Sequence, residues 1–190
     1  MIHDFILASA SPRRKELLAN VLIEPSDVMV SDINEDPLKN ELPNTYVKRV
    51  AREKAIYVAN RNPNRVVLSC DTIVAMGIRI MQKPKDREDA RNILQKLSGR
   101  SHKVLSSVCM IRKDGKISQK TITSRVVFKT ISDEEMEVYL DTNEWSDKAG
   151  GYGIQGYASC FIRKIIGSYS NIVGLPIMET KGLLSSVGIK

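Results

Sequence analysis

Asp71 has the setting that most strongly suggests chemistry, because it interrupts the apolar, β-branched run of residues 66–74. Burying a bare carboxylate costs several kcal/mol, so Asp71 must be paired, hydrogen-bonded or bound to a cation. From the carboxyl end of a central strand it would reach the crevice in which α/β sheets place ligands. The alternative is an aspartate that ends the strand and caps a turn.

A second carboxylate, Glu35, lies in the acidic segment DINED, residues 32–36. The segment begins like a calcium-binding EF-hand loop, but Pro37 stands where that loop needs glycine and Pro43 where it needs its bidentate glutamate. Two interpretations remain open. The segment is an exposed acidic loop, or it supplies Glu35 as a metal ligand or base opposite Asp71.

Two arginines, Arg13 and Arg14, occupy the first turn of a predicted helix that has Ser11 as its N-cap and Pro12 in its first position. Free backbone N–H groups and the helix dipole favour an anion at such a terminus, whereas positive side chains oppose the dipole. A bound phosphate would remove this conflict. The alternative is a solvated basic turn behind an ordinary Ser-Pro cap.

Lysines supply further candidate phosphate donors. Lys54 lies four residues after Val50 on the apolar stripe of a predicted helix, where it either snorkels to water or turns its ammonium into a cleft. Lys83, before Pro84, either belongs to a plain loop or adds another donor. His102 at the start of a strand is expected to be structural, and not catalytic.

The glycine-rich segment GYGIQG, residues 151–156, matches the dinucleotide pattern G-x-G-x-x-G. The match is rejected because that motif must open a helix in a βαβ unit, whereas the residues that follow here indicate a strand. The turn still allows close backbone approach to a ligand, and the Gln155 amide suits a base edge. A tight β connection is the alternative.

The elements that must position these residues alternate along the chain and predict an α/β fold with a mixed sheet. Strands are expected over residues 2–8, 65–76, 104–111, 117–129 and 160–166, with a hairpin turn at Asp114-Gly115. Helices are expected from Pro12, over 45–59, from the N-cap Asp86 to 97, from the capping box Ser132-x-x-Glu135 to 140, and from about Pro176.

Composition limits the classes of function. The 190 residues are 42% hydrophobic and 27% charged, which excludes global disorder and suits one domain over residues 1–190. Three dispersed cysteines exclude a disulfide framework or zinc site and suit a reducing cytoplasm, and no segment predicts a membrane span. With only two histidines in the sequence, Ser-His-Asp catalysis is not favoured. The net charge of +7 favours anionic binding partners.

Taken together, seven fragments resemble the Maf family of nucleoside triphosphate pyrophosphatases, in family order over nearly the whole chain. They are LASASPRR from Leu7, AREKA from Ala51, DTIV from Asp71, KP at Lys83, LSGRSH from Leu97, DKAGGY from Asp147 and VGLP from Val173. The chain departs from the family pattern at Asn34 and Asp36, at Ser69-Cys70, and at Leu105-Ser106-Ser107.

The resemblance implies a Maf/inosine triphosphatase-like fold, a twisted mixed sheet with helices and two lobes around a cleft, often in a homodimer. It implies hydrolysis of a nucleoside triphosphate to the monophosphate and pyrophosphate with a divalent cation, Mg²⁺ or Mn²⁺. By matching position, the phosphates would be held by Ser9, Arg13 and Arg14. Glu35 and Asp71 would bind the metal or activate water, and Lys54 and Lys83 would stabilise charge.

Within the family, Arg13, Thr72 and Gln155 are similar to the branch that prefers dTTP and UTP. The rival hypothesis is a basic nucleic-acid-binding or cell-division regulatory protein without hydrolysis. It is motivated by the positive charge, but one Trp and three Phe give little for base stacking, and no binding module is recognisable. Neither nucleic acid nor membrane is therefore expected as a partner.

Overall fold

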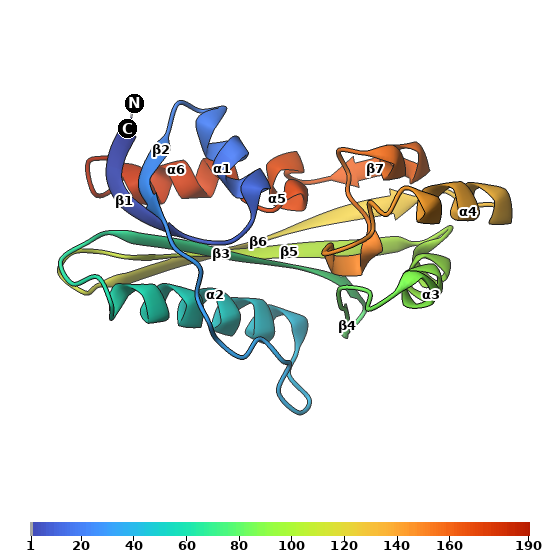
Figure 1. Ribbon diagram of the computed structural model, residues 1–190, viewed down its shortest axis with the longest axis horizontal. Coiled ribbons are helices and arrows are strands. Elements are labelled where there is room, and N and C mark those ends of the chain that lie inside the picture. Colours follow the sequence, from blue (N-terminus) through green and yellow to red (C-terminus); the bar gives the residue numbers. More distant parts are fainter. Residues whose placement is uncertain (1) are drawn as a thin grey trace.

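A seven-stranded mixed sheet is the frame of the molecule (Figure 1). The computed structural model describes residues 2–190, and its strands follow the order β2-β1-β3-β5-β6-β7, with β4 paired to β3. β2, β1 and β3 are parallel and the other pairs are antiparallel, which confirms the predicted mixed sheet. The strands are β1 (Ile2–Ala8), β2 (Glu24–Val28), β3 (Val67–Met76), β4 (Arg79–Met81), β5 (Ser101–Ile111), β6 (Ile117–Phe128) and β7 (Ile162–Ile166).

Helices cover both faces of this sheet (Figure 1). They are α1 (Pro12–Ala19), α2 (Pro43–Ala59), α3 (Arg87–Leu97), α4 (Asp133–Asp141), α5 (Tyr169–Val173) and α6 (Ile177–Ser185). Alternate residues of β1 show why its sequence is continuously apolar: Phe5 packs in the core beneath α1 and α6, whereas Ile6 packs against α2. A third core joins α3 and α4 to the other end of the sheet.

Most predicted element boundaries are confirmed. Asp86 caps α3, Ser132 and Glu135 form the capping box of α4, and a left-handed glycine turns the β5–β6 hairpin. α1 begins at Pro12 as predicted, but the Ser11 side chain makes no cap hydrogen bond. Within residues 2–190, every helix is too short or too polar to cross a membrane, and the three cysteines are free thiols.

The predicted strand over residues 160–166 is too long. Residues Tyr157–Phe161 form a 3₁₀ turn that places Phe161 in the core, so β7 begins only at Ile162. Three short elements were not predicted: β2, β4 and α5. β2 shows the reason, since its five residues alternate between exposed and half-buried, include Pro25 and contain no apolar run.

A gap along one side of β3 sets the place of the functional site. The ladder with β1 ends at the pair Ala8 and Ser69, and the ladder with β4 starts only at Val74. Asp71 lies between these ladders. The prediction that it stands at the carboxyl end of its strand is therefore wrong, because β3 continues to Met76 alongside β5.

An aromatic cluster holds the far end of the sheet and contains His102. Its Nε2 lies 2.7 Å from the Tyr152 hydroxyl, and its ring packs edge-on against Phe128 with centroids 4.9 Å apart. Only 2% of His102 is exposed, and burial lowers its pKa to about 4. The structure thus places His102 in the core, as predicted for a structural residue.

We expect His102 to make the protein acid-sensitive. Its pKa is depressed on folding, so the stability it contributes is complete above the unfolded value of about 6.5 and is lost as pH falls towards 4. The loss by pH 4 amounts to about 3 kcal/mol. Urea unfolding of His102→Gln should accordingly show a smaller decline in unfolding free energy between pH 6.5 and pH 4. Equal declines in both proteins would contradict this assignment.

Candidate functional site

A cleft of about 1060 Å³ opens at the gap beside β3. Helices α1 and α2 lie towards one end of the molecule, and α3 and α4 lie at the other end (Figure 1). Its wall includes all nine residues that the sequence analysis singled out as catalytic or substrate-binding. These are Ser9, Arg13, Arg14, Glu35, Lys54, Asp71, Thr72, Lys83 and Gln155. Segments from most of the chain length therefore meet in one place.

Lys54 joins the two predicted carboxylates at the floor of the cleft. Its Nζ donates a hydrogen bond of 2.6 Å to Oε2 of Glu35 and one of 2.8 Å to Oδ1 of Asp71. Lys54 and Asp71 are 9% and 7% exposed, so each buried charge has an opposite charge in contact. Of the alternatives for Lys54, the structure selects the inward-facing ammonium over snorkelling to water.

Helix α2 aims Lys54 at β3. Val47, Val50 and Ala51 are fully buried against the sheet, and Lys54 follows one turn later on the same face. The Ser69 hydroxyl donates a 2.6 Å hydrogen bond to the Ala51 carbonyl and so ties this turn of the helix to β3, two residues before Asp71. Ser69 is one of the departures from the family pattern, and here it helps to fix the distance between α2 and β3.

Glu35 reaches the cleft from the segment between β2 and α2, which contains no helix or strand. The Tyr46 hydroxyl donates a 2.7 Å hydrogen bond to the Glu35 carbonyl oxygen. Burial, together with the charges of Asp71 and Glu35, raises the pKa of Tyr46 to about 12, so the phenol keeps its donor proton at neutral pH. Residues 32–36 thus form a largely exposed acidic loop that also brings Glu35 opposite Asp71, so both interpretations of the segment describe part of the structure.

Arg14 differs from a free phosphate-binding arginine. Its guanidinium donates to the Ser9 hydroxyl at 2.8 Å, to the Gly174 carbonyl at 2.9 Å and to the Thr72 hydroxyl at 3.3 Å. These bonds fix the positive charge at the start of α1 and use three of its five N–H donors. Arg14 therefore presents a rigid charge with two remaining donors, beside the first backbone N–H groups of the helix.

Thr72 is also held by the protein itself. Its hydroxyl lies 2.8 Å from the Ser106 hydroxyl and donates to the Gly174 carbonyl at 3.2 Å, while Ser106 donates to the Asn171 carbonyl. Sequence reasoning missed Ser106 as a partner of Thr72. The one available signal was a polar residue inside an apolar strand, within the departure from the family pattern at Leu105-Ser106-Ser107.

The far wall of the cleft is formed by the glycine turn and its flanks. Gly150 has φ +71°, and a side chain there would come within 2.9 Å of Val74, so only glycine permits the close packing of this turn on β3. The turn carries the following residues across the cleft from Asp71, including the exposed Gln155. A 3₁₀ turn, Tyr157–Phe161, and then the strand β7 follow, so no α-helix opens here and the rejection of the dinucleotide motif stands.

Lys148 is a cleft-lining cation to which the sequence analysis gave no role. Arg13 lines the same cleft, and burial together with the nearby positive charge of Arg13 lowers the pKa of Lys148. Lys83 lies in the cleft wall as well, and is exposed. Arg13, Lys83 and Lys148 thus offer cationic side chains that can meet phosphate oxygens. The same cleft wall also carries the carboxylates of Asp36, Glu144 and Asp147.

The two carboxylates on Lys54 fit a divalent cation only in company with its ligand. Among residues 2–190, no three His, Cys, Asp or Glu side chains gather to hold an ion by themselves. Mg²⁺ is commonly bound by one or two carboxylates, waters and the phosphates of a substrate. Asp71 and Glu35 each use one oxygen on Lys54, which leaves their other oxygens as hard ligands suited to Mg²⁺ or Mn²⁺.

Comparison with known proteins gives matches over almost the full length. The family model described as Maf-like protein matches residues 4–187. A dTTP/UTP pyrophosphatase of Sphingopyxis alaskensis is 50% identical over 184 residues, covering 97% of this chain and 96% of that protein. Another dTTP/UTP pyrophosphatase, from Paramagnetospirillum magneticum, is 49% identical over 183 residues, with 96% of each covered.

Solved structures give a weaker likeness. The crystal structure of a nucleoside-triphosphatase, or dITP/XTP pyrophosphatase, from Mycobacterium abscessus superposes with a TM-score of 0.47 at 15% identity. It covers 99% of this chain and 95% of that one.

Proposed function

The chain belongs to the Maf-like protein family, and from this membership and its cleft we propose that it hydrolyses dTTP and UTP to the monophosphate and pyrophosphate. The observation that carries the proposal is the Glu35–Lys54–Asp71 cluster in a cleft that is also lined by further cationic side chains, Arg13, Arg14, Lys83 and Lys148. Such a site offers carboxylates where water must be activated and cations where triphosphate charge must be neutralised. The 50% identical relative, matched over 96% of its length, supports the same activity.

In the proposed reaction, a water oxygen attacks the α-phosphorus and the bond from that phosphorus to the bridging oxygen of the β-phosphate breaks. Pyrophosphate leaves, and the proton of the attacking water passes to a carboxylate. We assign this proton to Asp71, because it lies on the rigid strand β3 with one oxygen not used by Lys54. Glu35 comes from an irregular segment and would orient the charged groups around the reaction centre.

The cations of the cleft have separate tasks. Lys54 keeps the two carboxylates together without substrate, and its ammonium is placed to meet phosphate oxygens beside Asp71. Arg14 and the N–H groups of α1 offer a fixed phosphate site, with Ser9 holding the guanidinium in place. Arg13, Lys83 and Lys148 also line the cleft and would hold the outer phosphates and the leaving pyrophosphate.

A divalent cation, Mg²⁺ or Mn²⁺, would be held by Asp71 and Glu35 together with the substrate phosphates. When bound, it supplies charge neutralisation for the triphosphate and the developing transition state. The family resemblance also leads us to propose a cytoplasmic location and a homodimer.

We assign recognition of the base to Gln155, together with Thr72 and Arg13, which line the same cleft. A uracil or thymine edge has two carbonyl groups flanking an N–H, and one amide can meet such an edge with both a donor and an acceptor. Cytosine reverses two of these groups, because an amino donor replaces the 4-carbonyl and an unprotonated N3 replaces the N–H. An amide held in one orientation would therefore leave polar atoms unpaired. We therefore expect Gln155→Ala to lower kcat/KM for UTP more than for CTP, which reduces a ratio of about a hundredfold or more in the unmodified protein.

The function is tested by measuring pyrophosphate release from dTTP, UTP, CTP, GTP and ATP, with and without Mg²⁺. Release from dTTP and UTP that stops in excess chelator is the expected result. Equal kcat/KM for UTP, CTP and GTP would refute the base assignment and leave the hydrolysis itself standing. Salt-dependent DNA binding without any hydrolysis would refute the enzyme and favour the nucleic-acid-binding alternative.

A further inference from the structure

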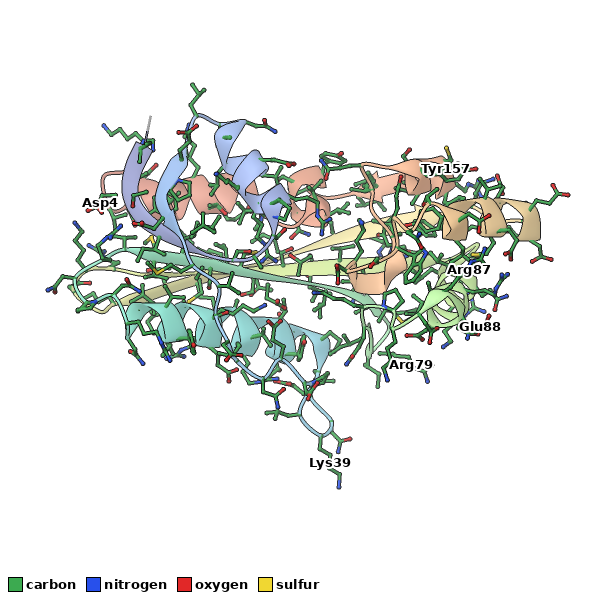
Figure 2. All side chains as sticks on the ribbon, viewed as in Figure 1. Asp4, Lys39, Arg79, Arg87, Glu88 and Tyr157 are labelled. Carbon is green, nitrogen blue, oxygen red and sulfur yellow. The ribbon has the colours of Figure 1, made fainter. Side chains whose placement is uncertain are left out.

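The segment that carries Glu35 is the irregular part of the active site. Residues 29–42 connect β2 to α2 without a helix or strand, apart from a turn at residues 39–40. Lys39 projects from the tip of this segment, away from the sheet (Figure 2). A connection of this length needs anchors if one of its side chains is to be placed to within a fraction of an ångström.

Arg49 supplies such an anchor from α2. Its Nε and Nη2 donate to Oε1 and Oε2 of Glu41, both at 2.8 Å, which is the bidentate arrangement of a guanidinium on a carboxylate. Nη2 also donates to the Asp36 carbonyl at 3.0 Å, and Nη1 donates to Glu53 at 3.0 Å. The Glu41 carboxylate in turn accepts the Leu38 N–H at 3.0 Å. One guanidinium thus connects both ends of the stretch 36–41 to the helix.

Burial makes this anchor stronger than an ordinary surface ion pair. The Glu41 side chain is only 4% exposed and that of Arg49 19%. The hydrogen bonds from Arg49 lower the pKa of Glu41, and Glu41 raises that of Arg49, so both remain charged over the range in which the protein would work. Fully engaged, bidentate pairs of this kind are the ones that contribute measurably to stability.

The anchor holds the backbone and leaves the functional carboxylate free. Arg49 bonds the carbonyl of Asp36, and Tyr46, one turn earlier on α2, bonds the carbonyl of Glu35. Neither contact uses the Glu35 carboxylate, which bonds only Lys54 among residues 2–190. The segment is therefore still held when Lys54 turns its ammonium towards a phosphate.

We propose that Arg49 is a positioning residue for the pyrophosphatase reaction, which through Glu41 and the Asp36 carbonyl holds residues 34–41 so that Glu35 faces Asp71. The proposal rests on the proposed function for its kinetic consequence. Its structural consequence, the order of residues 34–41, is independent of any substrate. Arg49 itself touches neither substrate nor the reacting atoms.

The test compares Arg49→Ala and Arg49→Lys with Arg52→Ala, which removes an exposed arginine from the same helix. A misplacement of about 1 Å costs on the order of a hundredfold in rate, so kcat for dTTP should fall about 10- to 100-fold in Arg49→Ala. KM should change less than about threefold, because the phosphate-binding cations are untouched. Arg49→Lys keeps the positive charge but cannot donate two parallel hydrogen bonds to the Glu41 carboxylate, so most of the loss in kcat should remain. Arg52→Ala should behave as the unmodified protein.

Two further readouts separate positioning from a merely structural role. Amide hydrogen exchange without substrate should become faster in residues 34–41 of Arg49→Ala and stay unchanged in β3. In a Glu35→Gln background, Arg49→Ala should cause little additional loss of kcat, because the residue it positions is already disabled. Unchanged exchange in residues 34–41, or additive losses in the double variant, would overturn the proposal. If the unmodified protein released no pyrophosphate from dTTP, the proposed function would fail, and the exchange measurement would still decide whether Arg49 orders this segment.

Discussion

Asp71→Asn is expected to lower kcat for dTTP by about a thousandfold while the protein stays folded. The substitution removes the group that accepts the proton of the attacking water, but it keeps the shape of the side chain and an oxygen that can accept from Lys54. Lys54 retains Glu35 at 2.6 Å, so no buried charge is left without a partner. The melting temperature Tm should therefore shift by no more than about 4 °C. A rise in Tm would fit the removal of a buried charge that serves catalysis at a cost in stability.

The matched control is Asp36→Asn, the same chemical change at an exposed, cleft-lining aspartate that no step of the mechanism uses. Its kcat should stay close to that of the unmodified protein. If Asp71→Asn unfolded, Asp71 would be a structural residue. If it turned over dTTP at the original rate with normal Mg²⁺ dependence, Asp71 would not be the base.

Lys54→Met should damage both activity and stability. Without the ammonium, the Asp71 and Glu35 carboxylates face each other with no positive charge between them. Removing one partner from a buried charge cluster costs about 3 kcal/mol, at the low end of the usual range because the Glu35 side chain is 46% exposed. kcat/KM for dTTP should fall by about a hundredfold or more, since a charge that meets the phosphates is lost.

A second measurement shows whether the carboxylates form the cation site. In Lys54→Met they no longer share an internal cation, so Mg²⁺ without nucleotide should raise Tm more than in the unmodified protein. Lys48→Met, which removes an exposed lysine from the same helix, controls for the loss of a positive charge. Identical Mg²⁺ responses in all three proteins would show that Asp71 and Glu35 do not bind the ion without nucleotide.

Sequence reasoning predicted those parts of the site that follow from local physics. Helix caps, turn residues and apolar periodicity were enough to predict most of the long helices and strands. The free-energy cost of an unpaired carboxylate in an apolar strand showed that Asp71 needs a partner. The identity of that partner was open, because Lys54 and Glu35 lie 17 and 36 residues away on other elements. Their meeting depends on the packing of α2 against β3, which no local pattern specifies.

The bonding of Arg14 could not be predicted for the same reason. Its carbonyl partner belongs to Gly174, 160 residues further along the chain, and comes within reach only when α5 packs beside α1. Short elements without an apolar run, such as β2, were missed because they form through pairing with a neighbouring strand. Their own sequences have no strong preference for a strand. Lys148 was missed because nothing in its local sequence shows that the glycine turn faces the cleft.

In the proposed reaction, water attacks the α-phosphorus of a pyrimidine nucleoside triphosphate. The decisive measurement is turnover of dTTP in ¹⁸O-enriched water, with the products analysed by phosphorus NMR and mass spectrometry. Attack at the α-phosphorus yields pyrophosphate without label and dTMP that carries one ¹⁸O on its phosphate. Label in the pyrophosphate, or orthophosphate as the first product, would contradict it.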